Sequence, residues 1–313
     1  MSHQMKLSVS PHIHSGNSTR RIMLDVLIAL LPTTIAGTII FGWKSLLVVA
    51  VCVASCVGFE ALFNLIVKKK QTIGDLSAAV TGLLLALNLP ADVPLWQCVL
   101  GSLFAIVVVK CLFGGIGCNP VNPAITARVF MLIAFSSTVA KVTLPRWAEP
   151  AVDGVSQATP LASETMPSLM DLFLGNHGGS IGEVCTLALL IGLLYLIVRK
   201  VITWHIPVAL IGTVFVASLF MEGFDFMMAL SLVMSGGLFI GAIFMATDYV
   251  TSPSTAWGKI IFGVGVGLIT FVIRYFAAYP EGVSFAILIM NILTPYIDSW
   301  TKHRVLVAGG KKA

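Results

Sequence analysis

The sequence predicts an all-α integral membrane protein of about ten transmembrane helices, arranged as two inverted repeats of five helices. Of its 313 residues, 57% are hydrophobic and only 11% are charged, and the mean hydropathy is +0.96. A chain of this composition has too few polar residues to cover the surface of a soluble domain. Apolar stretches of spanning length recur throughout, and basic residues are distributed unevenly between the loops. These observations exclude a soluble globular class.

Nine apolar stretches approach the ~20 residues that a helix needs to cross a bilayer. They lie at about 22–41, 45–67, 94–113, 123–140, 181–198, 201–220, 227–247, 258–278 and 283–300. A tenth stretch, residues 76–89, is followed by Pro90 and is only 14 residues long. It predicts a short or interrupted helix that its neighbours must shelter from lipid.

Basic residues indicate how these helices are oriented. With a cytoplasmic N-terminus, all but four of the 19 Lys and Arg residues fall at or near cytoplasmic helix ends; the exceptions are Lys44, Lys141, Arg146 and Arg274. The positive-inside rule then predicts that both termini are cytoplasmic. The expected organisation is a tail at 1–20, a first repeat at 21–140, an extracytoplasmic loop at 141–180, a second repeat at 181–301 and a cytoplasmic tail at 302–313.

A weak internal similarity agrees with the two inverted halves. Residues 80–83 (Val-Thr-Gly-Leu) begin the short third helix, and residues 235–238 (Ser-Gly-Gly-Leu) occupy the corresponding place in the eighth. Interrupted helices at equivalent positions of inverted repeats usually surround a site near the bilayer midplane. A chance likeness between two helices rich in Gly and Leu would give the same pattern.

A polar motif lies in the predicted extracytoplasmic loop, with the sequence Asp-Gly-Val-Ser-Gln-Ala-Thr at residues 153–159. Threonine has no redox chemistry and is a weak nucleophile, so Thr159 is of interest as the acceptor of a phosphate-linked group. The run resembles the motif at which a flavin transferase joins FMN to threonine through a phosphoester. Asp153, Ser156 and Ala158 match its recognition positions, whereas Gln157 stands where glycine is most common. An ordinary loop with a Thr-Pro turn is the alternative.

A second polar segment, residues 113–124, contains three glycines and places Asn119 and Asn122 three residues apart. An amide supplies both a donor and an acceptor, which matches the imide edge of an isoalloxazine, quinone or nucleobase ring. Capping of the following helix is an equally good interpretation. A third polar break, residues 245–253, contains Asp248, which could cap a helix, pair with Lys259 or face a site.

These motifs, together with residues 81–90 (Thr-Gly-Leu-Leu-Leu-Ala-Leu-Asn-Leu-Pro), resemble the D subunits of Rnf complexes. The homologous B subunits of the sodium-pumping NADH:quinone oxidoreductase share the pattern but have a longer N-terminal extension, which favours the Rnf subunits for a chain whose first helix starts near residue 22. The resemblance covers about residues 20–302. It implies a fold similar to urea and ammonium channels, in a prokaryotic inner membrane.

The resemblance also implies a function in a larger assembly, a translocase that moves electrons between ferredoxin and NAD while transporting Na⁺ or H⁺. FMN would be attached to Thr159, outside the membrane, and would exchange electrons with an FMN on the G subunit. The membrane A and E subunits and the peripheral C subunit would be further partners. Asn119 and Asn122 match asparagines associated with a non-covalent riboflavin in the quinone-reducing homologues. The chain itself would hold no catalytic residue and would not act alone.

Charged side chains complete the candidate sites. Lys141 and Arg146 are the basic residues of the long outer loop and could neutralise the phosphoester or only cap a helix. Ionisable residues at bilayer depth are Asp25, Glu60, Lys110, Arg128, Arg274 and Asp298. Such residues are usually functional, and Glu60 and Arg128 are our candidates for ion coupling.

The remaining sequence features exclude some classes of site. Six cysteines are scattered without a CxxC pair and predict neither disulfides nor a metal site. Nothing indicates a nucleic-acid partner. A channel or transporter without a redox role is the competing function, because the inverted architecture alone would suit it.

Overall fold

The computed structural model describes residues 18–147, 167–277 and 282–310, with side chains placed as far as residue 302. The first half contains α1 (Thr19–Phe41), α2 (Trp43–Ile66), η1 (Ile73–Asp75), α3 (Ser77–Leu87), α4 (Leu95–Leu103) with the π-helical η2 (Phe104–Cys111), and α5 (Pro123–Ala134). The second half contains α8 (Thr186–Val198), α9 (His205–Met221), α10 (Phe226–Met234), α11 (Leu238–Ile240) with the π-helical η4 (Gly241–Met245), α12 (Ala256–Phe276) and α13 (Val283–Gly310). Two short helices, α6 (Ser136–Val139) and α7 (Leu169–Leu174), lie between the halves in sequence.

The described residues form an all-α membrane protein, as predicted. By length and composition, α1, α2, α12 and α13 are each able to cross a membrane. The pair formed by α10 and α11–η4 passes the same test as one span bent by 66°. Five shorter apolar helices of 10–17 residues complete ten segments, five in each half. Shorter helices satisfy their own backbone hydrogen bonds but need neighbours to cover their ends.

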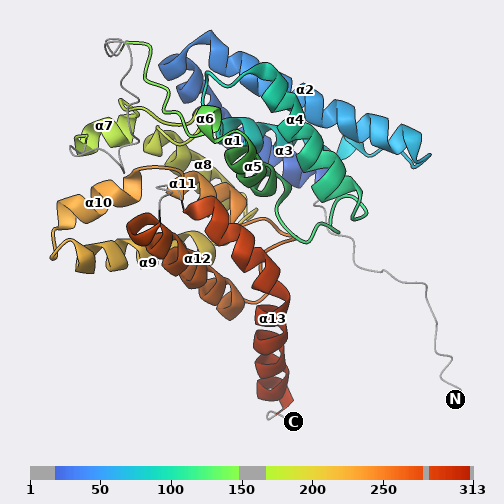
Figure 1. The fold of residues 1–313 in the computed structure, drawn as a ribbon. Helices are drawn as coiled ribbons and strands as arrows, with labels where there is room; N and C mark the ends of the chain where they lie inside the picture. The colour runs from blue at the N-terminus through green and yellow to red at the C-terminus, as the bar shows by residue number, and fades with distance from the viewer. Residues whose placement is uncertain (1–17, 148–166, 278–281, 311–313) are drawn as a thin grey trace, which may run out of the picture.

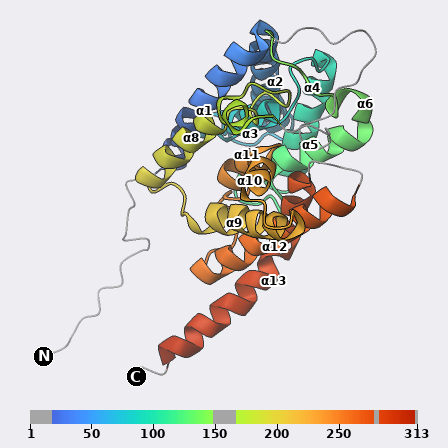
Figure 2. The same cartoon turned by 90° about the vertical axis from the view of Figure 1, so that its left-hand side faces the viewer.

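Helices pack against one another within each half, and two pairs of helices join the halves. Within each half the second segment packs on the third and the fourth, which pairs α2 with α3 and α4, and α9 with α10 and α12. Across the halves α1 packs on α8, and α5 packs on α13. Figures 1 and 2 show the first half, blue to green, beside the second half, yellow to red, with the yellow α8 next to α1. Buried apolar side chains from both halves form one contiguous core.

The third segment of each half is interrupted at a residue with left-handed backbone. In the first half this residue is Leu76 (φ 65°), between η1 and α3; in the second it is Gly236 (φ 69°), between α10 and α11. Residues 80–83 lie inside α3, after this break, whereas residues 235–238 span the break between α10 and α11. A leucine in this conformation gives no sequence signal, because glycine is the residue expected there.

Three helix boundaries differ from the expected ones. Helix α8 begins at Thr186 and not at 181, because the backbone N–H groups of Ile181 and Gly182 instead bond to the carbonyls of Leu89 and Leu87 at the end of α3 (3.1 and 2.7 Å). The stretch 123–140 is split at Phe135 into α5 and α6. The expected tail from 302 is helical as far as Gly310, since nothing before that glycine ends a helix. This part of α13 projects from the other helices (Figures 1 and 2).

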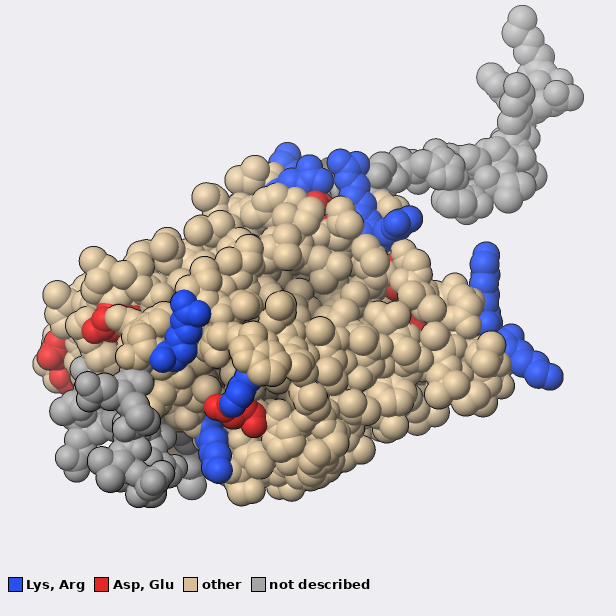
Figure 3. Space-filling model, turned by 90° about the horizontal axis from the view of Figure 1, so that it is seen from above, with Lys and Arg blue, Asp and Glu red and all other residues tan. Residues whose placement is uncertain are grey.

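The surface agrees with insertion in a membrane. Figure 3 shows a face that is largely free of charged side chains, with the basic residues in a few groups. Large apolar side chains such as Ile35, Leu194 and Val208 are more than half exposed. Burying such surface in lipid is favourable, whereas leaving it in water is not.

Candidate functional site

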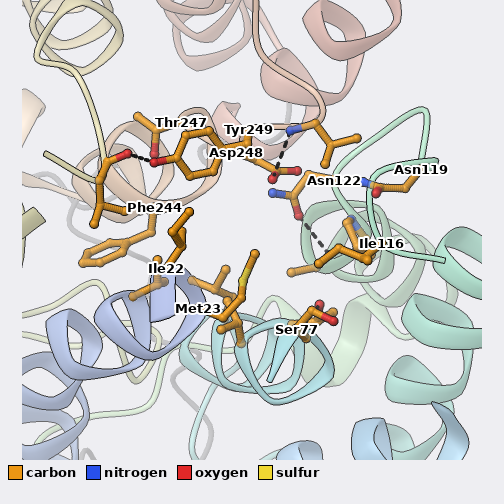
Figure 4. Close-up of a pocket in the computed structure, with 18 of the residues that line it drawn as sticks. Ile22, Met23, Ser77, Ile116, Asn119, Asn122, Phe244, Thr247, Asp248 and Tyr249 are labelled. Carbon is orange, nitrogen blue, oxygen red and sulfur yellow. Dashed lines mark hydrogen bonds between the residues drawn. The ribbon is translucent and has the colours of Figure 1, made fainter. Parts of the chain in front are cut away.

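A cavity of about 100 Å³ lies between the two halves, at the end of the molecule where α1, α3 and α5 begin. Its walls come from the first turns of these helices, from the segment before α5, from residues 196–202 and from the end of η4 with the loop that follows it. Most of the lining is apolar. The polar groups that face it include Ser77, Asn119, Asn122, Thr247 and Asp248, which Figure 4 shows converging from both halves.

Asn122 enters this cavity as the N-cap of α5. Its Oδ1 accepts hydrogen bonds from the backbone N–H groups of Ala124 and Ile125 (3.0 and 3.3 Å), and Pro123 is the first helical residue. Its Nδ2 donates to the carbonyl of Met245 at the end of η4 (3.2 Å). The capping interpretation is thus realised, and the same amide joins the first half to the second. A ligand would have to replace at least one of these bonds to use this side chain.

Asn119 is held differently. Its Nδ2 donates to the Val121 carbonyl (3.0 Å), and its Oδ1 has no protein partner among the described residues. The turn before it needs Gly114, Gly115 and Gly117, whose φ angles of 124°, 102° and 86° would strain any residue with a Cβ. Asn119 is therefore a buried amide, lining the cavity, that can offer an acceptor to a ligand.

The loop after η4 forms the opposite wall. Asp248 accepts a hydrogen bond from the Thr251 hydroxyl (3.1 Å), and Tyr249 donates its hydroxyl to the Val201 carbonyl. Burial raises the pKa of the Asp248 carboxyl, and hydrogen bonds from the Thr251 hydroxyl and from the backbone N–H groups of Val250 and Tyr249 partly oppose the shift. Lys259 does not pair with it; that amine donates to Thr203. The sequence left three roles open for Asp248: a cap, a partner of Lys259 or a group that faces a site. In the structure Asp248 accepts a hydrogen bond within its own loop and faces the cavity.

Lys110 connects this cavity to Glu60. The Lys110 ammonium lines the cavity and donates to the Ser77 hydroxyl (2.6 Å) and to Glu60 Oε1 (3.1 Å). Both charged side chains are only 3% exposed. Glu60 Oε1 also accepts from Thr72 (2.7 Å), which accepts in turn from Asn64, whereas Oε2 has no partner among the described residues. A buried ion pair costs desolvation energy, so stability alone does not explain its presence at this position.

The sequence identified Lys110 only as one of several ionisable residues at bilayer depth. Its pairing with Glu60 joins residues that are 50 positions apart, and no local pattern reports such a contact. The position of the Lys110 charge at bilayer depth was the signal in the sequence that could have identified this residue as part of the site. Arg128, our other candidate, is buried in α5. Asp25 pairs with Arg199 and accepts from Tyr195, and Asp298 pairs with Lys302.

The base of the outer loop is fixed at both ends. The Arg146 N–H bonds to the Ile40 carbonyl (2.9 Å), and Thr143 forms an isolated antiparallel bridge with Gly179. Trp147 Nε1 donates to Asn176 Oδ1 (2.6 Å). The side chains of Lys141 and Arg146 are exposed beside this base. Asp153, Ser156, Ala158 and Thr159 lie outside the described residues.

Within the described part of the chain, no group of three or more His, Cys, Asp or Glu side chains could hold a metal ion. Its six cysteines are free thiols, in agreement with the absence of a CxxC pattern.

Known proteins resemble this chain over almost its whole length. The sequence model of the NQR2, RnfD, RnfE family matches residues 6–307. The D subunit of the Na⁺-translocating ferredoxin:NAD⁺ oxidoreductase complex of Acetobacterium woodii is 46% identical over 96% of this chain and 95% of its own. The D subunit of the proton-translocating ferredoxin:NAD⁺ oxidoreductase complex of Clostridium ljungdahlii is 39% identical, over 95% and 94%. The D subunit of the ion-translocating oxidoreductase complex of Stutzerimonas stutzeri is also 39% identical, over 92% of each chain.

Proposed function

Because the chain belongs to the NQR2, RnfD, RnfE family, we propose that it is the D-type membrane subunit of an ion-translocating ferredoxin:NAD⁺ oxidoreductase complex. The observation that carries this proposal is the similarity to two subunits of such complexes, which are 46% and 39% identical to this chain over almost its full length. Their names specify Na⁺ in one case and protons in the other, so the transported ion is one of these two. The chain acts within the complex and not as an isolated enzyme.

The redox group in this proposal is FMN linked through its phosphate to Thr159. The surrounding Asp153, Ser156 and Ala158 form the motif read by a flavin transferase. Two features of the described residues support it: the segment is anchored at its base, and Lys141 and Arg146 are exposed nearby, where they can neutralise a phosphoester. A flavin accepts one or two electrons, and a tether keeps its local concentration high near its redox partners.

The distribution of charge supports the sidedness of this arrangement. Six lysines lie at the same end of the molecule as the start of α1: Lys68, Lys69 and Lys70 follow α2, Lys200 follows α8, Lys259 is in the first turn of α12 and Lys302 is within α13. The flavin loop emerges at the opposite end, where α1 ends. By the positive-inside rule the basic end is cytoplasmic and the loop is extracytoplasmic. The FMN-bearing G subunit would then meet the flavin loop from outside, within an assembly that also holds A, E and C subunits.

We propose the cavity between the halves as the site of a non-covalent riboflavin. Its apolar walls suit an isoalloxazine ring, and Asn119, Thr247 and Asp248 supply polar groups for the imide edge. The open volume of about 100 Å³ is small for a tricyclic ring, so the cavity must widen on binding. Asn119→Leu should lower the riboflavin extracted from the intact complex. FMN bound at Thr159 should be unchanged, and normal riboflavin content would contradict the site.

Ion coupling in this proposal involves Glu60, with Lys110 as its partner, and Arg128. A buried carboxylate with one oxygen that no described residue hydrogen-bonds can accept a proton or a desolvated cation. The Thr72 and Asn64 side chains extend the polar contacts of Glu60 toward the basic end of α2. This arrangement gives an ion a polar position inside an otherwise apolar bundle.

The decisive test is the fluorescence of covalent flavin. The Thr159→Ala variant of the intact complex, run on a denaturing gel, should lose the flavin fluorescence of this subunit completely while the chain remains inserted. Thr165→Ala, in the same loop segment, is the matched control and should keep the signal. Fluorescence that persists in Thr159→Ala would refute the attachment site, and its absence from the unmodified protein would favour a non-redox transporter.

A further inference from the structure

A second and larger cavity of about 780 Å³ lies at the basic end of the molecule. It is bounded by the segment before α9, the loop between η4 and α12, the first turn of α12 and residues 294–302 of α13. We propose that this cavity binds the phosphate group of an anionic phospholipid. The inference depends on neither flavin nor ion coupling.

The charges that line the cavity are mostly positive. Lys200, Lys259 and Lys302 face it from three different elements, and Asp298 is the one acidic residue in its lining. Three positive charges and one negative charge leave a net charge of +2. Asp298 is already engaged by Lys302 (3.0 Å) and by the backbone N–H of Ser254 (2.9 Å). The excess positive charge therefore falls to Lys200 and Lys259, which favours the binding of an anion in this cavity.

Neutral donors surround these lysines. The hydroxyls of Thr203, Ser252 and Ser299 belong to residues of the cavity lining, and Lys259 Nζ lies 3.2 Å from Thr203 Oγ1. Ile206, in the first turn of α9, also lines the cavity, and this 17-residue helix begins without a side-chain cap. Free N–H groups at a helix start favour an anion. Hydroxyls, amines and backbone N–H groups together match the several oxygens of a phosphate.

Aromatic residues place the cavity at the depth of lipid headgroups. Trp204 is 55% exposed and follows Thr203 of the lining; Trp257 is 71% exposed, two residues before Lys259; Trp300 is 53% exposed, two residues before Lys302. Exposed tryptophans concentrate at the boundary between hydrocarbon and water. Basic pockets between helices at this level on the cytoplasmic side suit anionic headgroups. This location favours a lipid over a soluble phosphate.

The test compares lipid binding by intact complexes that differ only in two lysines. Native mass spectrometry of detergent-purified complex would follow titration with phosphatidylglycerol or with phosphatidylcholine. Lys200→Gln/Lys259→Gln should weaken one phosphatidylglycerol-binding event by about fivefold per lysine, or roughly 25-fold in total. Lys68→Gln/Lys69→Gln is the matched control: Lys68 also follows a helix at the basic end with a φ of 56°, as Lys200 does, but lies outside the cavity.

Each outcome decides the proposal. Selective loss in the cavity variant, with binding retained by Lys200→Arg/Lys259→Arg and phosphatidylcholine binding unchanged, would support it. Equal phosphatidylglycerol binding by both glutamine variants would overturn it. Inorganic phosphate is the third probe: displacement of the lipid by millimolar phosphate would assign the cavity to a soluble anion and reject the lipid. A cavity variant that fails to assemble, while the arginine variant also loses phosphatidylglycerol, would show that positive charge alone is not what binds the lipid.

Discussion

The two halves of the molecule hold their interrupted third segments in different ways. In the first half, Lys110 of η2 reaches the start of α3, where its ammonium donates to the Ser77 hydroxyl at 2.6 Å. The same ammonium is paired with Glu60 of α2 at 3.1 Å, and both charges are buried. The start of α3 is thus held by an ion pair between two side chains.

In the second half, Arg274 of α12 has the corresponding position in the fourth segment. Its guanidinium donates to two backbone carbonyls at the end of α10, those of Leu232 (2.8 Å) and Ser235 (3.1 Å). Guanidinium remains protonated at every accessible pH and its planar donors fix geometry, whereas a carboxylate can bind and release a proton or cation. Under the proposed ion coupling, the first half would contain the element that changes state and the second half a fixed support.

The largest expected effect comes from breaking the ion pair of the first half. Lys110→Met leaves the Glu60 carboxylate buried without its cation, which should destabilise the protein by about 3–5 kcal/mol. The apparent melting temperature of the purified complex should fall accordingly. Replacing both partners, as Lys110→Met/Glu60→Leu, should recover most of this stability, because no charge is then left unbalanced.

The double variant separates structure from function. If Glu60 couples ion movement, the stable double variant in proteoliposomes should still transfer electrons while moving fewer Na⁺ or H⁺ ions per electron. An unchanged ion-to-electron ratio in that variant would show that the Lys110–Glu60 pair has only a structural role. The two halves would then not differ in function at this position.

A smaller effect is expected at the fixed support. Arg274→Gln removes charged hydrogen bonds to two carbonyls and should cost about 1.5–3 kcal/mol, visible as a lower melting temperature of the complex. Ion transport and electron transfer should decline together, with their ratio preserved. A selective loss of ion transport in Arg274→Gln would show that the second half also takes part in coupling.

Local patterns predicted much of the fold and part of the site. Apolar stretches were enough to locate the ten segments, although five of their helices are only 10–17 residues long. These stretches could not locate the break at Leu76, the early residues 181–185 that cap α3, or the bond from Asn122 to a carbonyl 123 residues away. These features depend on contacts between segments, which composition does not encode. The flavin motif at Thr159 remains a prediction from sequence.

The ends of the third segments provide a second contrast between the halves. Met245, at the end of η4, is capped by the amide of Asn122, which does not titrate. The end of α3 is capped by the non-helical segment before α8, which contains His177. The two ring nitrogens of His177 contact the carbonyls of Gly178 and Val184 (3.0 and 3.1 Å). A neutral imidazole has one N–H and can donate to only one of these two oxygens.

The smallest predicted effect tests whether this cap responds to pH. Burial lowers the pKa of His177 from its ordinary value of 6.5, although the two carbonyls and Asp171 act in the opposite direction. The unfolded chain then binds a proton before the folded one does, so stability is complete above about pH 6.5 and falls as the pH drops toward the lowered pKa. The slope cannot exceed about 1.4 kcal/mol per pH unit for one group.

Melting temperatures measured from pH 8 to 5 should show this loss in the unmodified complex and a flatter profile in His177→Gln. If the melting temperature of His177→Gln still fell with pH as much as that of the unmodified complex, His177 would not make the cap of α3 sensitive to pH. The cap of α3 would then resemble the Asn122 cap of η4 in this respect.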